Sequence, residues 1–434
     1  MQGRAVGLID IHGDLFHHVR QYIAALTLKH PELAKRVVIV DPTCPEHTVS
    51  INPLEAIAGQ SQERTALFLT DIVIKIWQIS PNESPRLVWL LTNSFLALAN
   101  LGLTLADFPR WLQDKAWRNS LVPQITHEAV SRYWANEFPR SDKEIQQWIA
   151  PAANKLGGIL FDTDVQHVLT GSSHISMRDI LDQGLILLVH IPKGILGERS
   201  AFLLGAFIVA QIQKAALSRA NTPDRRQFYF YLDEFHNFTT DYIQDVLAES
   251  RKYGLSLVLA HQFLDQLDTK LRSAVINTVG TLVSFRIGYK DARAIVYEMF
   301  PTPDFPRYRG DIDTGSWEQL ALELANLPPR SFWVRRRGPF VPTKQRTLDM
   351  PDPVNNPQVQ MALQRLIETS GRLYGAKRQL PSTSVPVATL PTPATDNGLI
   401  SIRPSQTPSV AEKAEKDRQT YEPNSIFSDI VWDQ

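Results

Sequence analysis

Two adjacent carboxylates, Asp233 and Glu234, directly follow an apolar run in the sequence FYFYLDEFHN, which spans 228–237. A buried strand of this kind delivers the residues after it to one edge of a sheet. Phosphoryl transfer needs an acid that holds a magnesium-bound water and a neighbouring base that orients the attacking water. We expect Asp233 to hold magnesium through water and Glu234 to be the base. The alternative is that both carboxylates only cap the following helix.

Two more polar side chains are expected near this pair. The strand sequence SLVLA is followed by His261 and Gln262, so a second polar pair reaches the carboxyl edge of the sheet, where open α/β folds bind ligands. Gln262 is a candidate sensor of the γ-phosphate. Arg286, in TLVSFRI, is a candidate for stabilising transition-state charge in a neighbouring subunit. A structural ion pair is the equally weighted alternative for Arg286.

The loop that normally cradles the phosphates is absent from the sequence. The pattern G-x-x-x-x-G-K-[ST] does not occur in the 434 residues. Such a loop contributes backbone N–H groups and a lysine, which make most of the phosphate contacts. The sequence therefore contains half of a phosphoryl-transfer site, and we expect this chain on its own to bind ATP poorly.

Composition excludes several other classes of site. Lys+Arg and Asp+Glu balance at 45 each, so there is no global basic field for nucleic acid, although a local basic face remains compatible with this balance. The single cysteine, Cys44, excludes an internal disulfide, and no zinc-ligand spacing occurs. No run reaches the roughly 18–20 apolar residues of a membrane helix. We expect a cytoplasmic protein that reaches the inner face of a membrane only through partners or a missing N-terminal segment.

The elements that must position these residues alternate along the chain. Strands are expected at 5–11, 36–40, 185–191, 228–232, 255–260, 281–287 and 331–335. Helices are expected at 15–30, 200–219, about 240–254 and 268–276, with another that begins near Asp291. This order predicts an α/β fold with a doubly wound, mostly parallel sheet, which the strand at 331–335 completes.

A helical region interrupts this alternation. Residues 57–162 read as an all-α insert, and six of the nine tryptophans lie there: Trp77, Trp89, Trp111, Trp117, Trp134 and Trp148. We interpret them as the core of a helical bundle, with a base-stacking surface as the alternative. The expected domains are 1–56 and 163–345 for the two parts of the α/β domain, 57–162 for the insert, 346–378 for a helical extension and 379–434 for a disordered Pro/Ser/Thr-rich tail.

Several motifs in order resemble those of a known family. They are IDIHGDL at 9–15, DPTCPEHTVSINPL at 41–54, YLDEFHNF at 231–238, ESRKYGLSLVLAHQ at 249–262 and NTVGTLVSFRIGYKDA at 277–292. Together they resemble the FtsK/HerA superfamily of DNA-pumping ATPases, and within it the TraG/TraD-like coupling proteins of conjugation and type IV secretion. The resemblance covers roughly residues 5–345.

The resemblance implies a RecA-like nucleotide-binding domain that works with ATP and Mg²⁺. Asp233 would be the magnesium-side acid, Glu234 the catalytic base and Gln262 the sensor, with Asp10 and Asp14 beside the phosphate site. It also implies a homo-hexamer that translocates DNA. Its partners would be a relaxase, a nucleoprotein or secretion-channel proteins, and the helical insert would recognise the substrate. The family's P-loop precedes the IDIHGDL motif, so the resemblance describes an N-terminally truncated member.

Two alternatives to a DNA-translocating ATPase remain open. The first is a non-hydrolysing remnant or scaffold subunit that keeps the fold and binds DNA or secretion partners. The second is a fragment of a DExH-type helicase, because Asp233 to His236 read DEFH. The helicase would need the same missing loop, and nothing downstream resembles its arginine-rich final motif.

Overall fold

The structure is a computed structural model, and most of the chain before residue 378 is described. The described residues are 5–44, 46–55, 61–77, 79–157, 160, 162–169, 175–238, 250–300, 314–338, 341–350, 352 and 356–377. All of them belong to one compact unit, Met1–Gln379. Most of the helix expected at about 240–254 and the whole tail expected at 379–434 lie outside the described residues.

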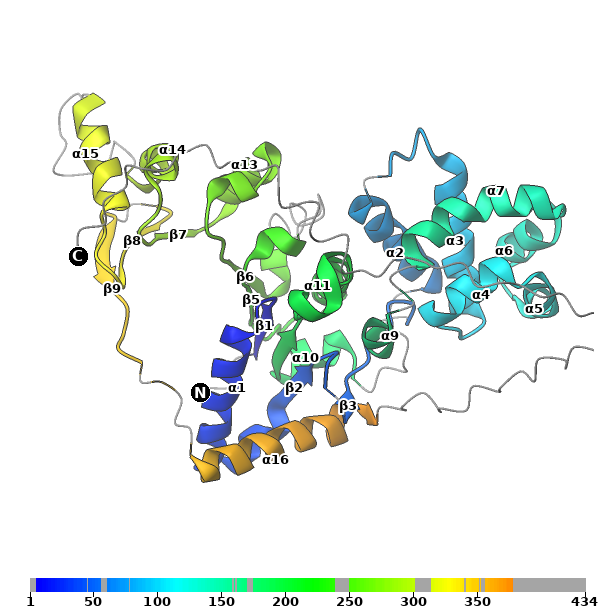
Figure 1. Ribbon diagram of the computed structural model, residues 1–434, viewed down its shortest axis with the longest axis horizontal. Coiled ribbons are helices and arrows are strands. Elements are labelled where there is room, and N and C mark those ends of the chain that lie inside the picture. Colours follow the sequence, from blue (N-terminus) through cyan, green and yellow to red (C-terminus); the bar gives the residue numbers. More distant parts are fainter. Residues whose placement is uncertain are drawn as a thin grey trace, which may run out of the picture. The chain divides into compact units, whose positions relative to one another are not determined.

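A five-stranded parallel sheet forms the centre of this unit (Figure 1). Its strand order is β2 (Val37–Val40), β4 (Ile186–His190), β1 (Ala5–Asp10), β5 (Phe228–Leu232) and β6 (Leu255–Leu259). All four neighbouring pairs are parallel. Every residue of β2 and β4 is buried, as expected for parallel strands covered on both faces. The doubly wound parallel sheet predicted from the sequence is confirmed.

Helices α1 (Asp14–Thr27) and α11 (Lys193–Leu217) cover opposite faces of the sheet (Figure 1). Successive side chains of a strand point to opposite faces. Leu8 of β1 accordingly packs in one cluster with Phe16 of α1, whereas Ile9 packs in another cluster with Phe207 of α11. Helix α11 is long and apolar enough to cross a membrane, but 83% of its apolar window is buried inside the protein. We therefore interpret α11 as a core helix.

The segment expected as a C-terminal extension packs against the first part of the chain. Helix α16 (Pro357–Tyr374) places Leu366 in the same cluster as Phe16 of α1. The Ile39 backbone N–H donates to Ser370 Oγ at 2.9 Å. After the helix, β10 (Ala376–Lys377) pairs antiparallel with β3 (His47–Thr48). These contacts make α16 part of the layer that covers β2 and α1.

Residues 61–169 are predominantly helical. The α-helices are α2 (Gln62–Ile76), α3 (Pro85–Asn100), α4 (Phe108–Gln113), α5 (Lys115–Leu121), α6 (Glu128–Arg132), α7 (Asp142–Ala152) and α9 (Thr163–Leu169). Trp111 and Trp134 are buried in their core with ring centroids 5.0 Å apart, so the bundle-core interpretation is confirmed for these two residues. Trp89 is 54% exposed and does not fit it. Helix α10 (Met177–Gln183) then leads into β4.

The strands near 281 and 331 do not complete the central sheet, so that part of the prediction is wrong. After helix α13 (Thr269–Thr278), β7 (Thr281–Ser284), β8 (Ser331–Arg336) and β9 (Thr343–Arg346) form a separate antiparallel sheet. This sheet accompanies α14 (Tyr289–Met299) and α15 (Thr314–Ala325). Leu282 and Trp333 pack against the core of these helices, whereas Val283 is 46% exposed. One covered face is typical of an antiparallel sheet.

The packing of α11 against the residues that follow β5 predicts a loss of stability when Gly205 is replaced. A Cβ atom at Gly205 would overlap the ring of Phe238, which is fully buried just after β5. Because a packed core resists added volume, we expect Gly205→Ala to lower the free energy of unfolding by about 1–3 kcal/mol in a denaturant titration. Gly194→Ala, in the short helical turn of α11 that precedes the non-helical Gly197, is the control, since nothing lies within 4 Å of its Cβ position. Equal stability of the two variants would contradict this packing.

Candidate functional site

Three neighbouring strands bring the candidate residues to one edge of the sheet. Asp10 ends β1, Asp233 and Glu234 follow β5, and Gln262 lies just beyond β6. The Asp233 backbone N–H donates to Ile9 O at 3.1 Å, so the end of β5 is held against β1. Because these strands are parallel, their carboxyl ends meet at the same edge. The predicted juxtaposition of the β5 carboxylates with the polar residue after β6 is therefore present.

Glu234 is held in an unusual backbone conformation. Its φ is 48°, in the left-handed region, and its side chain is buried at 7% residue exposure. Non-glycine residues in this region cost about 1–3 kcal/mol and persist where the surroundings determine them. Here Asn237 supplies that support, because both its backbone N–H and its side-chain Nδ2 donate to Glu234 O, at 2.9 and 3.0 Å. In this conformation the carboxylate lies within hydrogen-bond distance of Gln262, which follows β6.

Gln262 contacts the candidate base directly. Gln262 Nε2 donates to Glu234 Oε1 at 2.7 Å, and Gln262 N donates to Gln266 Oε1 at 3.1 Å. The other carboxylate oxygen, Oε2, lies 3.3 Å from His236 Nδ1. Burial lowers the pKa of His236, which favours the neutral ring at neutral pH, although Glu234 opposes this shift. The Gln262 amide therefore fixes the orientation of the Glu234 carboxylate.

Asp233 lies in an environment that disfavours its negative charge. Partial burial raises the pKa of Asp233, and the nearby carboxylates of Asp10 and Glu234 raise it further. Repulsion of this kind is relieved by a proton or by a cation. Among the described residues, no group of three or more His, Cys, Asp or Glu side chains is arranged to hold a metal ion. A cation at Asp233 would therefore keep most of its water ligands.

Asp10 and Asp14 differ in their surroundings. Asp10 is fully buried, and its two oxygens accept the backbone N–H groups of His12 at 2.9 Å and Phe16 at 2.8 Å. These bonds shape the turn between β1 and α1, where Gly13 adopts a φ of 95°. Asp14 is exposed in the first turn of α1. Asp10 thus supports the turn through its own carboxylate, while Asp14 is free to face a ligand.

Arg286 is not brought to the carboxylates. It is exposed in the segment between β7 and α14, beyond the separate antiparallel sheet. Within the described residues, no hydrogen bond or ion pair joins it to Asp233 or Glu234. The structural ion pair considered for Arg286 is likewise not observed there. Its expected role in a neighbouring subunit is therefore not tested within one chain.

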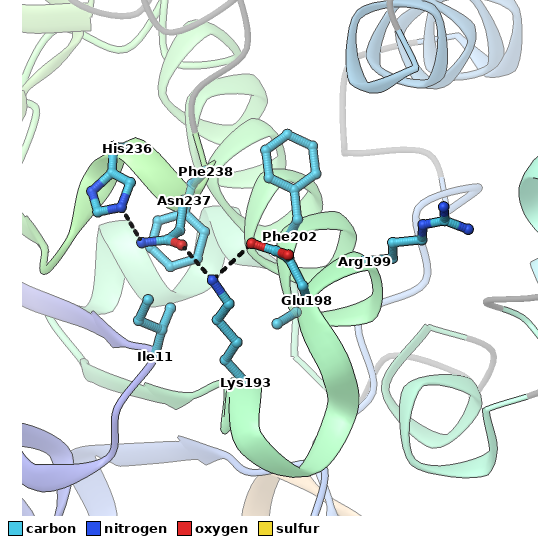
Figure 2. Close-up of a pocket in the computed structure, with 9 residues that line it drawn as sticks. Ile11, Lys193, Glu198, Arg199, Phe202, His236, Asn237 and Phe238 are labelled. Atoms are coloured by element: carbon cyan, nitrogen blue, oxygen red, sulfur yellow. Dashed lines mark hydrogen bonds and ion pairs between the residues drawn. The ribbon is translucent and has the colours of Figure 1, made fainter. Parts of the chain in front are cut away.

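A second group of side chains near this edge was not anticipated. Lys193 follows β4, and its Nζ donates to Glu198 Oε1 at 2.9 Å and to Asn237 Oδ1 at 3.4 Å (Figure 2). These side chains line a cavity of about 330 Å³ that also contacts His236. Arg199 extends away from the Lys193 contacts (Figure 2). The signal in the sequence that could have revealed this group is Lys193, which directly follows the apolar run LILLVHIP, just as the other polar residues directly follow their strands.

The contrast between Asp10 and Asp14 can be measured. Asp10→Asn replaces one of two oxygens that accept buried backbone N–H groups, so we expect a loss of about 1–3 kcal/mol in the free energy of unfolding. Asp14→Asn removes only a favourable charge near an exposed helix N-terminus, which costs about 0.3–1 kcal/mol. Denaturant titrations of both variants provide the comparison. A larger loss for Asp14→Asn than for Asp10→Asn would contradict the structural role of Asp10.

The environment of Asp233 predicts a pH-dependent gain in stability on its replacement. An acid with a raised pKa binds more protons in the folded state than in the unfolded state, so its contribution to stability falls as pH rises above the ordinary value of 3.8. We therefore expect Asp233→Asn to raise the melting temperature at about pH 7, with a gain that shrinks towards about pH 4. Asp14→Asn controls for the loss of one charge. A lower melting temperature for Asp233→Asn at neutral pH would exclude this account.

Comparison with known proteins relates this site to a family. A model of the type IV secretion-system coupling protein DNA-binding domain matches residues 164–293. Plasmid coupling protein TrwB in complex with the GTP analogue GDPNP has a TM-score of 0.54 at 16% identity, over 82% of this chain and 88% of that one. The unbound monoclinic form of the bacterial conjugative coupling protein TrwBdeltaN70 has a TM-score of 0.52 at 14% identity, over 82% of this chain and 87% of that one. TrwB in complex with ADP and Mg²⁺ has a TM-score of 0.51 at 15% identity, over 82% of this chain and 88% of that one.

No curated protein sequence matches the chain significantly. At these identities the solved structures show the fold, which is the RecA-like fold of TrwB. The family model adds the sequence match, and its range includes β4, β5 and β6 together with both β5 carboxylates. Residues 164–293 therefore match the type IV secretion-system coupling protein DNA-binding domain, within a fold similar to that of TrwB.

Proposed function

We propose that this chain is the catalytic-base half of a DNA-translocating ATPase of the coupling-protein type. The observation that carries the proposal is the arrangement around Glu234. A buried carboxylate in a strained backbone accepts from Gln262 at 2.7 Å, and Asp233 precedes it at the same strand end. Strain of this kind occurs most often where a side chain must be aimed for function.

Each of these three residues has a distinct proposed role. Asp233 holds Mg²⁺ through its water ligands, because Mg²⁺ dehydrates reluctantly and commonly keeps several waters. The crowding of negative charge that raises the pKa of Asp233 makes a cation favourable there. Glu234 accepts the proton of the attacking water. Gln262 positions this base, since its amide donates to Glu234 Oε1 while His236 Nδ1 lies 3.3 Å from Oε2.

The proposed cofactors are ATP and Mg²⁺. TrwB has been solved with a GTP analogue, and also with ADP and Mg²⁺, which supports nucleotide binding by this fold. The phosphate-cradling loop itself is absent from the 434 residues. We therefore propose that productive nucleotide binding needs a loop supplied from outside these residues, whose N–H groups and lysine contact the phosphates.

DNA is the proposed macromolecular substrate. The matched coupling-protein DNA-binding domain spans residues 164–293, and it includes Arg251 and Lys252, which are both exposed. We propose that these two cations contact DNA phosphates in a hexamer, and that Arg286 reaches the site of the adjacent subunit. The domain boundaries 1–56, 57–162, 163–345, 346–378 and 379–434 are part of the proposal. We also propose that the helical insert recognises a relaxase, a nucleoprotein or a secretion channel, and that the protein acts on the cytoplasmic side of a membrane.

The roles of the two carboxylates can be separated once a phosphate-binding loop is supplied. We would fuse the strand, phosphate-binding loop and following helix of a coupling protein to the N-terminus of the full chain, and we expect magnesium-dependent ATP hydrolysis. Glu234→Gln should then reduce turnover by at least about 100-fold while ATP affinity stays largely unchanged, because a base acts on the attacking water. Asp233→Asn should weaken magnesium-nucleotide binding as well, as measured by calorimetry. Undiminished hydrolysis by the Glu234→Gln fusion would exclude the proposed base.

The same fusion tests the arginine. Arg286→Ala should impair turnover only in assembled oligomers, and mixing it with Glu234→Gln subunits should recover activity if the arginine acts on a neighbour. No recovery, with assembly intact, would argue against action in a neighbouring subunit. The alternative function, a non-hydrolysing subunit that binds DNA or secretion partners, is favoured by the absence of the loop from the sequence. A fusion that binds ATP and DNA without hydrolysing ATP would support that alternative.

A further inference from the structure

A side chain approaches each of the two carboxylate oxygens of Glu234. Gln262 Nε2 donates to Oε1 at 2.7 Å, and His236 Nδ1 lies 3.3 Å from Oε2. Both of these last two atoms, Oε2 and Nδ1, are buried from solvent. A buried carboxylate oxygen needs a hydrogen-bond donor, because water cannot reach it. Whether His236 is that donor depends on which of its ring nitrogens carries the proton.

The surroundings of His236 favour the neutral ring. Burial is the largest cause that lowers the pKa of His236, and the nearby charges of Lys193 and His12 also lower it, whereas Glu234 acts in the opposite direction. A neutral imidazole carries one proton, on Nδ1 or on Nε2, and its other nitrogen is an acceptor. The hydrogen bond that one nitrogen makes decides the state of the other. The partners of Nε2 therefore determine what Nδ1 presents to Glu234.

Asn237 presents an amide donor to Nε2 of this ring. Its Nδ2 lies 3.0 Å from His236 Nε2 and also donates to Glu234 O at 3.0 Å. The oxygen of the same amide, Oδ1, accepts from Lys193 Nζ at 3.4 Å (Figure 2). An ammonium group only donates, so this contact identifies the amide oxygen and places the NH₂ group towards the ring. His236 Nε2 is therefore an acceptor from Asn237.

Gln266 presents a second amide donor to the same nitrogen. Its Nε2 lies 3.4 Å from His236 Nε2. Its Oε1 accepts the backbone N–H groups of Gln262 and Phe263, both at 3.1 Å. Backbone N–H groups also only donate, so they orient this amide independently of Asn237. Two amides, each oriented by its own partners, thus direct NH₂ groups at His236 Nε2.

We propose that His236 is a positioning residue for Glu234. Asn237 and Gln266 hold the ring in the tautomer that carries its proton on Nδ1, and this N–H donates to Glu234 Oε2. The opposite tautomer would set the lone pair of Nδ1 against the carboxylate and a ring N–H against two NH₂ groups. Neutral donors therefore hold both oxygens of the carboxylate. The role of Glu234 as the base rests on the proposed function, whereas the tautomer of His236 does not.

The contact joins the candidate base to the cavity beside Lys193. Lys193 donates to Asn237, which donates to His236. His236 in turn donates to Glu234, so the three bonds run in one direction and polarise one another. Both intermediate residues lie in the single turn Phe235–Phe238 that follows β5. The residues after the two carboxylates in DEFHN therefore act on the second of them.

The position of the proton can be measured in the full chain without nucleotide. We would record proton–nitrogen NMR correlations of the histidine rings at about pH 7.5, where an ordinary histidine is neutral. The signals of His236 are identified by their loss in His236→Asn, and we expect a protonated Nδ1 and an unprotonated Nε2. His18 is the internal control, because it is exposed and should average between both tautomers. A proton on Nε2 of His236, alone or shared with Nδ1, would overturn the proposal.

The effect on the base is tested in the fusion that carries a phosphate-binding loop. His236→Leu removes the donor, so we expect kcat to fall at least about tenfold with little change in the KM for ATP, because only the orientation of the base is lost. His236→Asn places an amide N–H where Nδ1 lies, and it should restore kcat to within about threefold of the unmodified fusion. Equal losses of kcat in the two variants, or no loss in His236→Leu, would overturn the positioning role.

The two measurements separate this inference from the proposed function. If Nδ1 carries the proton but the fusion does not hydrolyse ATP, the contact between His236 and Glu234 stands and the proposed function fails. If the fusion hydrolyses ATP and needs Glu234 but the proton lies on Nε2, the proposed function stands and the positioning of the base by His236 is wrong.

Discussion

The parallel register of β1, β5 and β6 is the constraint on which the candidate site depends. Ile9 pairs with Leu232 and Leu232 pairs with Leu259, so the residues that follow these strands leave the sheet at one level. Three polar chain segments that are far apart in sequence thereby meet at one edge. A slip of one residue would turn every side chain to the opposite face and would move Glu234 away from Gln262.

At the carboxyl edge of the central sheet, two acidic side chains lie in positions that cost stability. Glu234 is buried in a left-handed backbone conformation, and the pKa of Asp233 is raised by burial and by its carboxylate neighbours. The surroundings offset these costs with specific bonds, such as those from Asn237 to Glu234 O and from Gln262 to Glu234 Oε1. Concentrated strain and charge of this kind are typical of a site that is completed by a ligand.

The candidate site lies at the ends of β5 and β6, two strands that carry partly exposed side chains on the α1 side of the sheet. Tyr231 of β5 is 43% exposed and Val258 of β6 is 39% exposed, and among the described strands none pairs with β6 on its outer edge. The phosphate-binding loop pattern does not occur in the 434 residues, so the N–H groups and the lysine that such a loop contributes are not supplied by them.

The sequence by itself determined the buried strands of the central sheet, their alternation with helices, and the candidate residues at the strand ends, because long apolar runs and polar strand ends are local signals. It did not separate β7 and β8 from the central sheet, since TLVSF reads as a buried strand until its partners are known. The tertiary structure alone decided that Asp10 is bonded to the β1–α1 turn and that Gln262 holds Glu234. It also decided that α16 packs on α1, and that none of the described strands pairs with β6 on its outer edge. These features depend on contacts between distant segments, which no local pattern encodes.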